Sequence, residues 1–258
     1  MPFAPINGIE LFYEDTDPDG AQGLPVLVLL HGAAGNHMSW WQQIPFFRQD
    51  YRCIAIDHRG FGRSADATGE GTLRFIDDLE ALIGHLRLED VSLVAQSMGG
   101  RAALGYTVRH PGNVRALVMA DTWGFFDWPE QQELARSMQP AVTTPLVHRA
   151  LADSYQEQHP ALTFLYRQIQ ALNPPRDATQ VMAEGAPTLE QVRACSVPTL
   201  CLVGAEDRVT PPPLISALAE QLPNARYVEV PGSGHSVYFE KPERFNELVG
   251  EFLAEHRS

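Results

Sequence analysis

The sequence predicts an α/β fold, a doubly wound and mostly parallel sheet of about eight strands with an inserted helical segment. Three observations support this prediction. Short apolar runs alternate with helical patterns along most of the chain, as in sheets whose parallel strands are joined by crossover helices. Most of these runs are almost continuously apolar, which is typical of strands covered on both faces. The alternation stops only over residues 123–190, which have helical composition, several prolines and no strand-like run.

The first element should be a hairpin, because Asn7 and Gly8 form a two-residue turn signal between short strand-like segments. We expect this hairpin to form the antiparallel edge of the sheet. Six further strands are expected at about 26–31, 52–57, 91–96, 114–120, 198–203 and 225–230. Helical patterns lie near 72–86, 98–110, 211–221 and 240–256.

The elements follow one another without a linker, and 258 residues are enough for one large core. We therefore predict an α/β core of residues 1–122 and 191–258, and an inserted helical cap of residues 123–190.

Ser97 stands at a predicted sharp turn between a strand and a helix. Ala95 and Gly99 lie two positions on either side of it, where a tight turn brings backbone against backbone. A serine hydroxyl is a weak nucleophile until a base is paired with it, and a strained turn at a sheet edge presents it to such a base. Ser97 is therefore a candidate nucleophile.

A candidate base and a candidate acid also follow predicted strands. His235 lies in a glycine-rich loop after the run 225–230, and Asp207 follows the run 198–203. The chain order is serine, acid, histidine, which differs from the order in the chymotrypsin and subtilisin types. Asp121 also follows a strand, so it is the alternative candidate for the acid.

A fourth element is the loop after residues 26–30, where backbone N–H groups can point at a developing negative oxygen. Together with the serine turn, the acid and the histidine, this loop makes the chain resemble the α/β-hydrolase superfamily. The resemblance implies the fold predicted above. The blocks that carry this resemblance are His31-Gly32, the run from Asp57 to Ser64, the Ser97 turn, the Asp207 loop and Gly234-His235. They are spread over nearly the whole chain.

The resemblance implies roles for several further residues. The oxyanion hole of this fold takes one N–H from the residue after the nucleophile and one from the loop after the third strand, here Met98 and Ala33. The superfamily also implies that His31 orders the oxyanion loop and that Asp57, Arg59 and Ser64 are scaffold residues.

In this superfamily a cap between the sixth and seventh strands covers the active site. Its apolar residues are therefore candidates for the pocket that takes the acyl or leaving group, although each could equally serve the packing of the cap itself. The candidates are Trp123, Phe125, Phe126, Trp128, Met138, Leu146, Phe164 and Leu165.

The chemistry expected is acyl transfer to water. His235 would take the proton of Ser97, and Asp207 would orient the imidazole. We expect a serine hydrolase that cleaves esters or lactones of small to medium, largely apolar substrates. One alternative is a carbon–carbon bond hydrolase or lyase of a dienoic or diketo acid, and cofactor-free halide peroxidation would be a side activity of the same site. A non-catalytic ligand receptor on this fold is another alternative.

An acid-bearing substrate would favour a buried arginine. Arg101 follows the serine turn at a place where some superfamily members bind a substrate carboxylate, although a surface ion pair or an ion pair within the protein is the more common explanation of such an arginine. Further arginines lie within the predicted cap, at Arg149, Arg167 and Arg176.

The composition excludes other classes of partner. A net charge of −13, from 19 basic and 32 acidic residues, argues against nucleic acid and anionic membranes, which leaves a small-molecule substrate. The sequence shows no signal peptide, no apolar stretch near twenty residues and no metal-ligand spacing of its three cysteines. We expect a cytoplasmic protein without a metal or an organic cofactor. The oligomeric state has no signal in the sequence.

Overall fold

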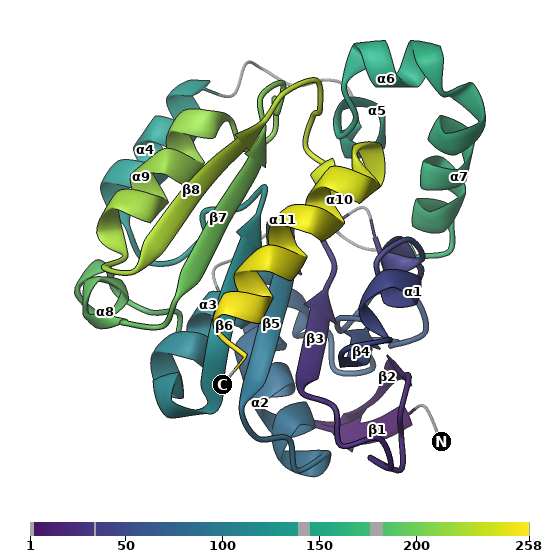
Figure 1. Ribbon diagram of the computed structural model, residues 1–258, viewed down its shortest axis with the longest axis vertical. Coiled ribbons are helices and arrows are strands. Elements are labelled where there is room, and N and C mark those ends of the chain that lie inside the picture. The colour runs from purple at the N-terminus through teal and green to yellow at the C-terminus, as the bar shows by residue number, and fades with distance from the viewer. Residues whose placement is uncertain (1–2, 34, 139–144, 176–182, 258) are drawn as a thin grey trace.

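The computed structural model describes residues 3–33, 35–138, 145–175 and 183–257. It has an eight-stranded sheet with the strand order β1-β2-β4-β3-β5-β6-β7-β8, which confirms the predicted fold class (Figure 1). Only β1–β2 and β2–β4 pair antiparallel, and the other neighbours are parallel. The strands are β1 (Phe3–Ile6), β2 (Ile9–Asp15), β3 (Val26–Leu30), β4 (Arg52–Ile56), β5 (Val91–Gln96), β6 (Val114–Ala120), β7 (Thr199–Gly204) and β8 (Ala225–Val230).

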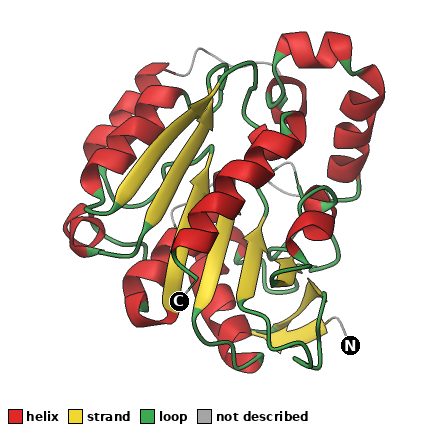
Figure 2. Cartoon of the chain, viewed as in Figure 1, coloured by secondary structure: helices red, strands yellow, loops and turns green. Residues whose placement is uncertain are grey.

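Helices cover both faces of the sheet (Figure 2). Alternate residues of β3 belong to two separate cores, one on each face of the sheet: Val28 lies in the core that includes Leu79, Leu104 and Leu218, and Leu27 lies in the core that includes Phe47 and Val249. The α-helices are α1 (Ile44–Phe47), α2 (Phe75–His85), α3 (Gly100–Arg109), α4 (Pro129–Met138), α5 (Leu146–Arg149), α6 (Asp153–Gln158), α7 (Pro160–Ala171), α8 (Leu189–Ala194), α9 (Pro212–Gln221), α10 (Val237–Glu240) and α11 (Pro242–Glu255). Short 3₁₀ helices are η1 (His37–Trp40), η2 (Gly71–Arg74), η3 (Ser97–Gly99) and η4 (Pro111–Asn113).

The hairpin prediction is confirmed. Ile6 pairs with Ile9, and the two turn residues Asn7 and Gly8 have φ values of 42° and 81°. Positive φ at both central positions is the geometry that an Asn-Gly turn favours. The helix expected near 240–256 is found as α11, whereas the short α10 before it was not predicted; Pro242 has no N–H to continue α10 and instead begins α11.

Within residues 123–190, between β6 and β7, the described part contains α4 to α7 joined by loops, and α8 begins at Leu189 and continues four residues past the predicted end of the segment. Its first helix, α4, lies beside α9, where the Gln131 side-chain amide donates to the carbonyl of Leu214 at 2.6 Å (Figure 1). The helices α5, α6 and α7 lie at the other end of the segment, near α10. The inserted segment thus contacts the core at two separate places.

This segment is also tied to the loop after β3. Asn36 donates from its side chain to the carbonyl of Ile169, at 2.8 Å. Asn173 accepts the N–H of Gly62 at 2.8 Å and donates to the carbonyl of Gly35 at 3.2 Å. The end of α7 is therefore fixed to the segment that the sequence assigns to the oxyanion loop.

No helix within the described ranges is both long enough and apolar enough to cross a membrane.

Candidate active site

The predicted catalytic residues all follow strands whose carboxyl ends meet at one edge of the sheet. Because β3, β5, β6, β7 and β8 are neighbours and parallel, the loops after them converge there. This edge is where open α/β sheets bind ligands. Ser97 follows β5, Asp207 follows β7 and His235 follows β8.

The turn at Ser97 is strained, since the residue has a φ of 47°. Non-glycine residues rarely adopt such a conformation, and it is found at sites where the surrounding structure enforces it. The enforcing contact comes from Gly99, where an added Cβ would collide with the carbonyl oxygen of Leu30 and lie 2.9 Å from that of His31. The small residue predicted at this position is thus required by the backbone of the neighbouring strand.

Replacing Gly99 by alanine should lower the free energy of unfolding by about 1–3 kcal/mol, because backbone carbonyls cannot rotate away from the new methyl group. It should also displace Ser97 and reduce turnover. Urea unfolding and kcat measure the two effects. Gly84→Ala is the matched control, since nothing lies within 4 Å of an added Cβ in α2, and it should stabilise by about 0.5–1 kcal/mol. Wild-type stability and turnover in Gly99→Ala would contradict this account.

Three buried side chains form a hydrogen-bonded relay at this edge. The Nε2 atom of His235 lies 2.8 Å from Oγ of Ser97, and its Nδ1 atom lies 2.8 Å from Oδ2 of Asp207. The exposed fractions are 5% for Ser97, 2% for His235 and 3% for Asp207. These contacts are within the hydrogen-bond reach that a nucleophile, its base and an orienting acid need.

The Asp207 carboxylate is itself held by its own loop. Its Oδ1 atom accepts the N–H groups of Val209 at 2.7 Å and Thr210 at 2.9 Å. The Thr210 hydroxyl lies 2.9 Å from Oδ2 and 2.8 Å from the carbonyl oxygen of Asp121. The acid is therefore fixed in orientation before any substrate arrives.

Asp121, the alternative acid, is fully buried and engaged elsewhere. Its carboxylate accepts the N–H of Gly204 at 3.0 Å and that of Val237 at 3.3 Å. Burial, reinforced by the negative charge of Asp207, raises its pKa well above the usual range. None of the hydrogen bonds found among the described residues joins Asp121 to His235. The geometry thus favours Asp207 over Asp121 as the acid.

The two candidate oxyanion donors lie beside Ser97. Met98 is the next residue, and Ala33 follows Gly32, where an added Cβ would come within 2.9 Å of the Ser97 Cβ. His31 shapes this loop, because its Nε2 atom accepts the N–H of His58 at 3.0 Å and its Nδ1–H can then donate to the carbonyl of Gly32 at 2.8 Å. This agrees with the ordering role inferred for His31.

The three residues expected to have a scaffold role, Asp57, Arg59 and Ser64, are buried and form hydrogen bonds or ion pairs. The Ser64 hydroxyl donates to the Asp57 carbonyl at 2.8 Å and accepts the N–H of Phe12 at 2.8 Å. Arg59 makes a two-pronged ion pair with Asp78, at 2.8 and 2.7 Å. These contacts join the loop after β4 to α2 and β2.

Sequence reasoning missed Gln96, which contacts the loops of both the base and the oxyanion hole. Its side-chain amide donates to the His235 carbonyl at 2.7 Å, and its Oε1 atom fills the space that a side chain at Gly32 would need. The available signal was a polar residue at the end of an otherwise apolar run, next to the serine. Gln96 thus holds the histidine loop beside the oxyanion loop.

The aromatic candidates of the inserted segment cluster next to α3, the helix that follows the Ser97 turn. The rings of Trp123 and Phe125 lie 4.9 Å apart, and the rings of Phe126 and Trp128 lie 5.6 Å apart. The guanidinium of Arg101, on α3, lies 4.7 Å from the Phe125 ring centroid. The aromatic cluster therefore contacts α3 through Phe125.

The other apolar candidates divide into two groups. Met138, Leu146 and Leu165 are partly buried and pack against the cores. Phe164 is 63% exposed, so the expectation that it lines an enclosed pocket is wrong. It occupies a solvent-facing position of α7, and helical composition alone does not reveal which face of a helix is buried.

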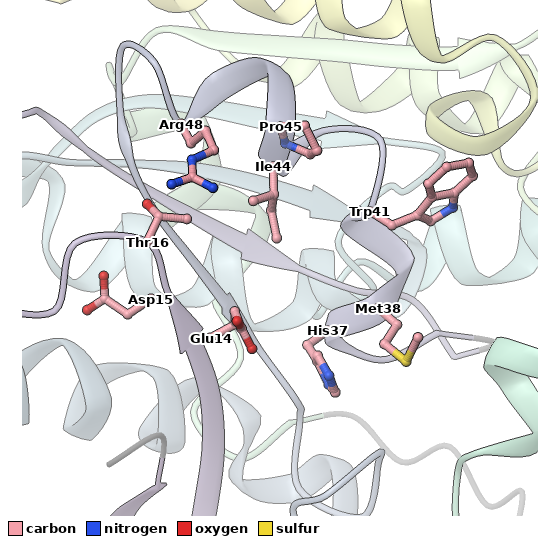
Figure 3. A pocket seen from close by; sticks show the side chains of 9 residues that line it. All are labelled: Glu14, Asp15, Thr16, His37, Met38, Trp41, Ile44, Pro45 and Arg48. Atoms are coloured by element: carbon pink, nitrogen blue, oxygen red, sulfur yellow. The ribbon is translucent and has the colours of Figure 1, made fainter.

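A separate surface pocket of about 490 Å³ opens between β2 and the η1–α1 segment (Figure 3). It is lined by Glu14, Asp15, Thr16, His37, Met38, Trp41, Ile44, Pro45 and Arg48. Two of its polar groups are paired, since Asp15 binds Arg52 at 2.6 Å and His37 binds Asp57 at 2.9 Å. It contains none of the three relay residues. We place the chemistry at the strand ends, where the groups are arranged for proton transfer.

No group of three or more His, Cys, Asp or Glu side chains in the described ranges is arranged to hold a metal ion.

Comparison with known proteins gives consistent matches along the chain. The family model of the alpha/beta hydrolase fold matches residues 25–242. A Mycobacterium tuberculosis protein named putative non-heme bromoperoxidase BpoC is 30% identical, over 95% of this chain and 98% of its own. A 2-hydroxymuconate semialdehyde hydrolase of Pseudomonas sp. is 30% identical, over 92% of this chain and 89% of its own.

A solved structure is similar over the whole length. The malate-bound thermophilic esterase from Thermogutta terrifontis is 30% identical and has a TM-score of 0.79, covering 100% of this chain and 98% of its own.

Proposed function

Because the chain belongs to the α/β-hydrolase family, we propose that it hydrolyses carboxylic esters or lactones through an acyl-enzyme on Ser97. The observation that carries this proposal is the relay from Ser97 through His235 to Asp207, with both contacts at 2.8 Å. The similarity to the thermophilic esterase supports an ester as the bond that is cleaved.

The proposed reaction has two rounds of proton transfer. Oγ of Ser97 attacks the substrate carbonyl while Nε2 of His235 takes the hydroxyl proton, and the N–H groups of Met98 and Ala33 stabilise the oxyanion. His235 then protonates the leaving alkoxide, which departs and leaves the acyl group on Ser97. Water attacks this ester with His235 again as the base, and collapse of the intermediate releases the acid while His235 returns the proton to Oγ of Ser97. Asp207 holds the imidazole in the productive tautomer throughout.

The substrate preference follows from the aromatic cluster beside α3. Phe125 is partly exposed and forms an aromatic cluster with the buried rings of Trp123 and Phe126, so an apolar acyl or leaving group should be favoured beside it. Met138 and Leu146 are the further candidates for this pocket. A substrate of this kind is small to medium and largely apolar.

A panel of substrates tests the proposal. p-Nitrophenyl and naphthyl esters from acetate to decanoate, together with small lactones, should be hydrolysed with a clear optimum of acyl length. A fluorophosphonate should label Ser97, as read by mass spectrometry of the modified peptide. A chain that neither cleaves any of these compounds nor reacts with the fluorophosphonate would refute the proposed function.

A second candidate function has a specific observation in its favour. Arg101 is 6% exposed, four residues after Ser97, and burial lowers its pKa to about 10. A substrate carboxylate beside it would stabilise the buried charge. This suits a carbon–carbon bond hydrolase of a dienoic acid, and a relative at 30% identity carries the name of a semialdehyde hydrolase. Adding a 2-hydroxy-6-oxo-dienoic acid to the panel decides between the two bonds.

A further inference from the structure

Glu240 is a buried carboxylate that receives three backbone hydrogen bonds. It ends α10, five residues after His235, and is 4% exposed. Its Oε1 atom accepts the N–H of Gly234 at 3.0 Å and that of Ser236 at 3.3 Å. Its Oε2 atom accepts the N–H of Ala152 at 2.9 Å. One side chain therefore binds two separate stretches of backbone.

These two stretches have different places in the proposed site. Gly234 and Ser236 flank His235, so Oε1 holds the peptide groups on both sides of the catalytic imidazole. Ala152 lies between α5 and α6, in the inserted segment, and Figure 1 shows α10 beneath these helices. The Glu240 carboxylate thus joins the histidine loop to the inserted segment.

Independent contacts surround the same junction. An added Cβ at Gly234 would lie 2.6 Å from the nitrogen of Ala152, so the two backbones touch directly. The hydroxyls of Tyr166 and Ser236 are 2.9 Å apart, which links α7 to the residue after His235. A shift of the inserted segment should therefore also shift the His235 imidazole.

We propose that Glu240 is a positioning residue that fixes His235 against Ser97 by clamping the histidine loop to the Ala152 backbone of the inserted segment. This inference rests on the proposed function, since it assigns Glu240 a role through His235. Glu240 does not contact the reacting atoms. It sets the distance over which His235 exchanges a proton with Ser97.

The charge of Glu240 gives the clamp a measurable signature. Burial, opposed by the three N–H bonds and supported by Asp207, raises its pKa to about 7. The ionisable groups that face it are Asp121, Asp207, Tyr155, Tyr166 and Tyr238, with His235 in the clamped loop. Protonation near neutral pH puts a hydrogen on a group that faces only donors, so the clamp should weaken as the pH falls through about 7.

The test uses Glu240→Gln, which keeps the shape but presents N–H donors to backbone donors. A misplacement of about 1 Å can cost about 10²-fold, so kcat for the best ester should fall about 10- to 100-fold with KM within threefold. The rate of fluorophosphonate reaction at Ser97 should fall by the same factor. On its acid side, the pH profile of this labelling rate should lose the ionisation of Glu240 that the wild type shows. Glu243→Gln, exposed on the next helix, is the control and should match the wild type.

If Glu240→Gln does not fold, backbone amide hydrogen exchange of the wild-type protein tests the inference instead. The amides of Gly234, Ser236 and Ala152 should share one protection factor and lose it together between pH 8 and 6, after correction for intrinsic rates. Independent exchange of Ala152, or a folded Glu240→Gln with wild-type kcat and labelling rate, would overturn the inference. A wild type inert to every ester and to the fluorophosphonate would instead refute the proposed function, whatever the amides show.

Discussion

Replacing Ser97 by alanine should lower kcat/KM for the best ester by at least about 10⁴-fold, because no other group can form the acyl-enzyme. The apolar contacts that bind the substrate would be unchanged, so the affinity for a product acid should stay within a few-fold. Steady-state hydrolysis and a binding titration of that acid measure the two quantities. Residual catalysis would come from the oxyanion donors and from binding alone.

Ser92→Ala is the matched control for this experiment. Ser92 lies on the same strand, β5, is also buried and has no part in the relay, so its loss should leave turnover close to that of the wild type. If Ser97→Ala kept more than a tenth of wild-type activity while Ser92→Ala behaved normally, another nucleophile would have to be sought. The proposed acyl-enzyme would then be wrong.

Replacing Asp207 by asparagine should lower kcat by about 10⁴-fold, because an asparagine amide can present a donor to Nδ1 of His235 and so favour the wrong tautomer. Asp121→Asn should cost less than about tenfold in kcat, since Asp121 binds the backbone of Gly204 and Val237 instead. The comparison of the two variants at one pH, with thermal unfolding to check their folding, identifies the acid. A loss of about 10⁴-fold in Asp121→Asn alone would move the acid to β6.

The strands of the fold could be predicted almost to the residue. For the six parallel-type runs, the predicted bounds differ from the observed ones by one residue at most, as with 198–203 against Thr199–Gly204. Strands that are buried on both faces have nearly continuous apolar runs, and the helices and loops of this chain do not have such runs. The helix bounds were less accurate, because helix ends fray: the predicted 72–86 and 240–256 extend one to three residues beyond the ends of Phe75–His85 and Pro242–Glu255.

The candidate triad could also be predicted, because each of its members follows a strand and parallel strands bring their ends together. The residues that hold the triad could not. Gln96 and Glu240 bind backbone groups that are distant in sequence: the His235 carbonyl lies 139 positions after Gln96, and the Ala152 N–H lies 88 positions before Glu240. Every residue has a backbone amide, so the residue type of the partner does not show that a side chain binds it. Spacing and periodicity therefore do not predict such a contact.

Two hydrogen bonds between the inserted segment and the core affect whether this segment can be exchanged with that of a relative. Ala152 is bound by Glu240, and the Ile169 carbonyl is bound by Asn36, so both catalytic loops share hydrogen bonds with the insertion. In a chimera that exchanged residues 123–190 alone, Asn36 and Glu240 would keep these hydrogen bonds only if the new segment placed a carbonyl and an N–H where those of Ile169 and Ala152 lie. Transplanting a substrate preference into this scaffold should succeed only when Asn36 and Glu240, or their counterparts, travel with the exchanged helices.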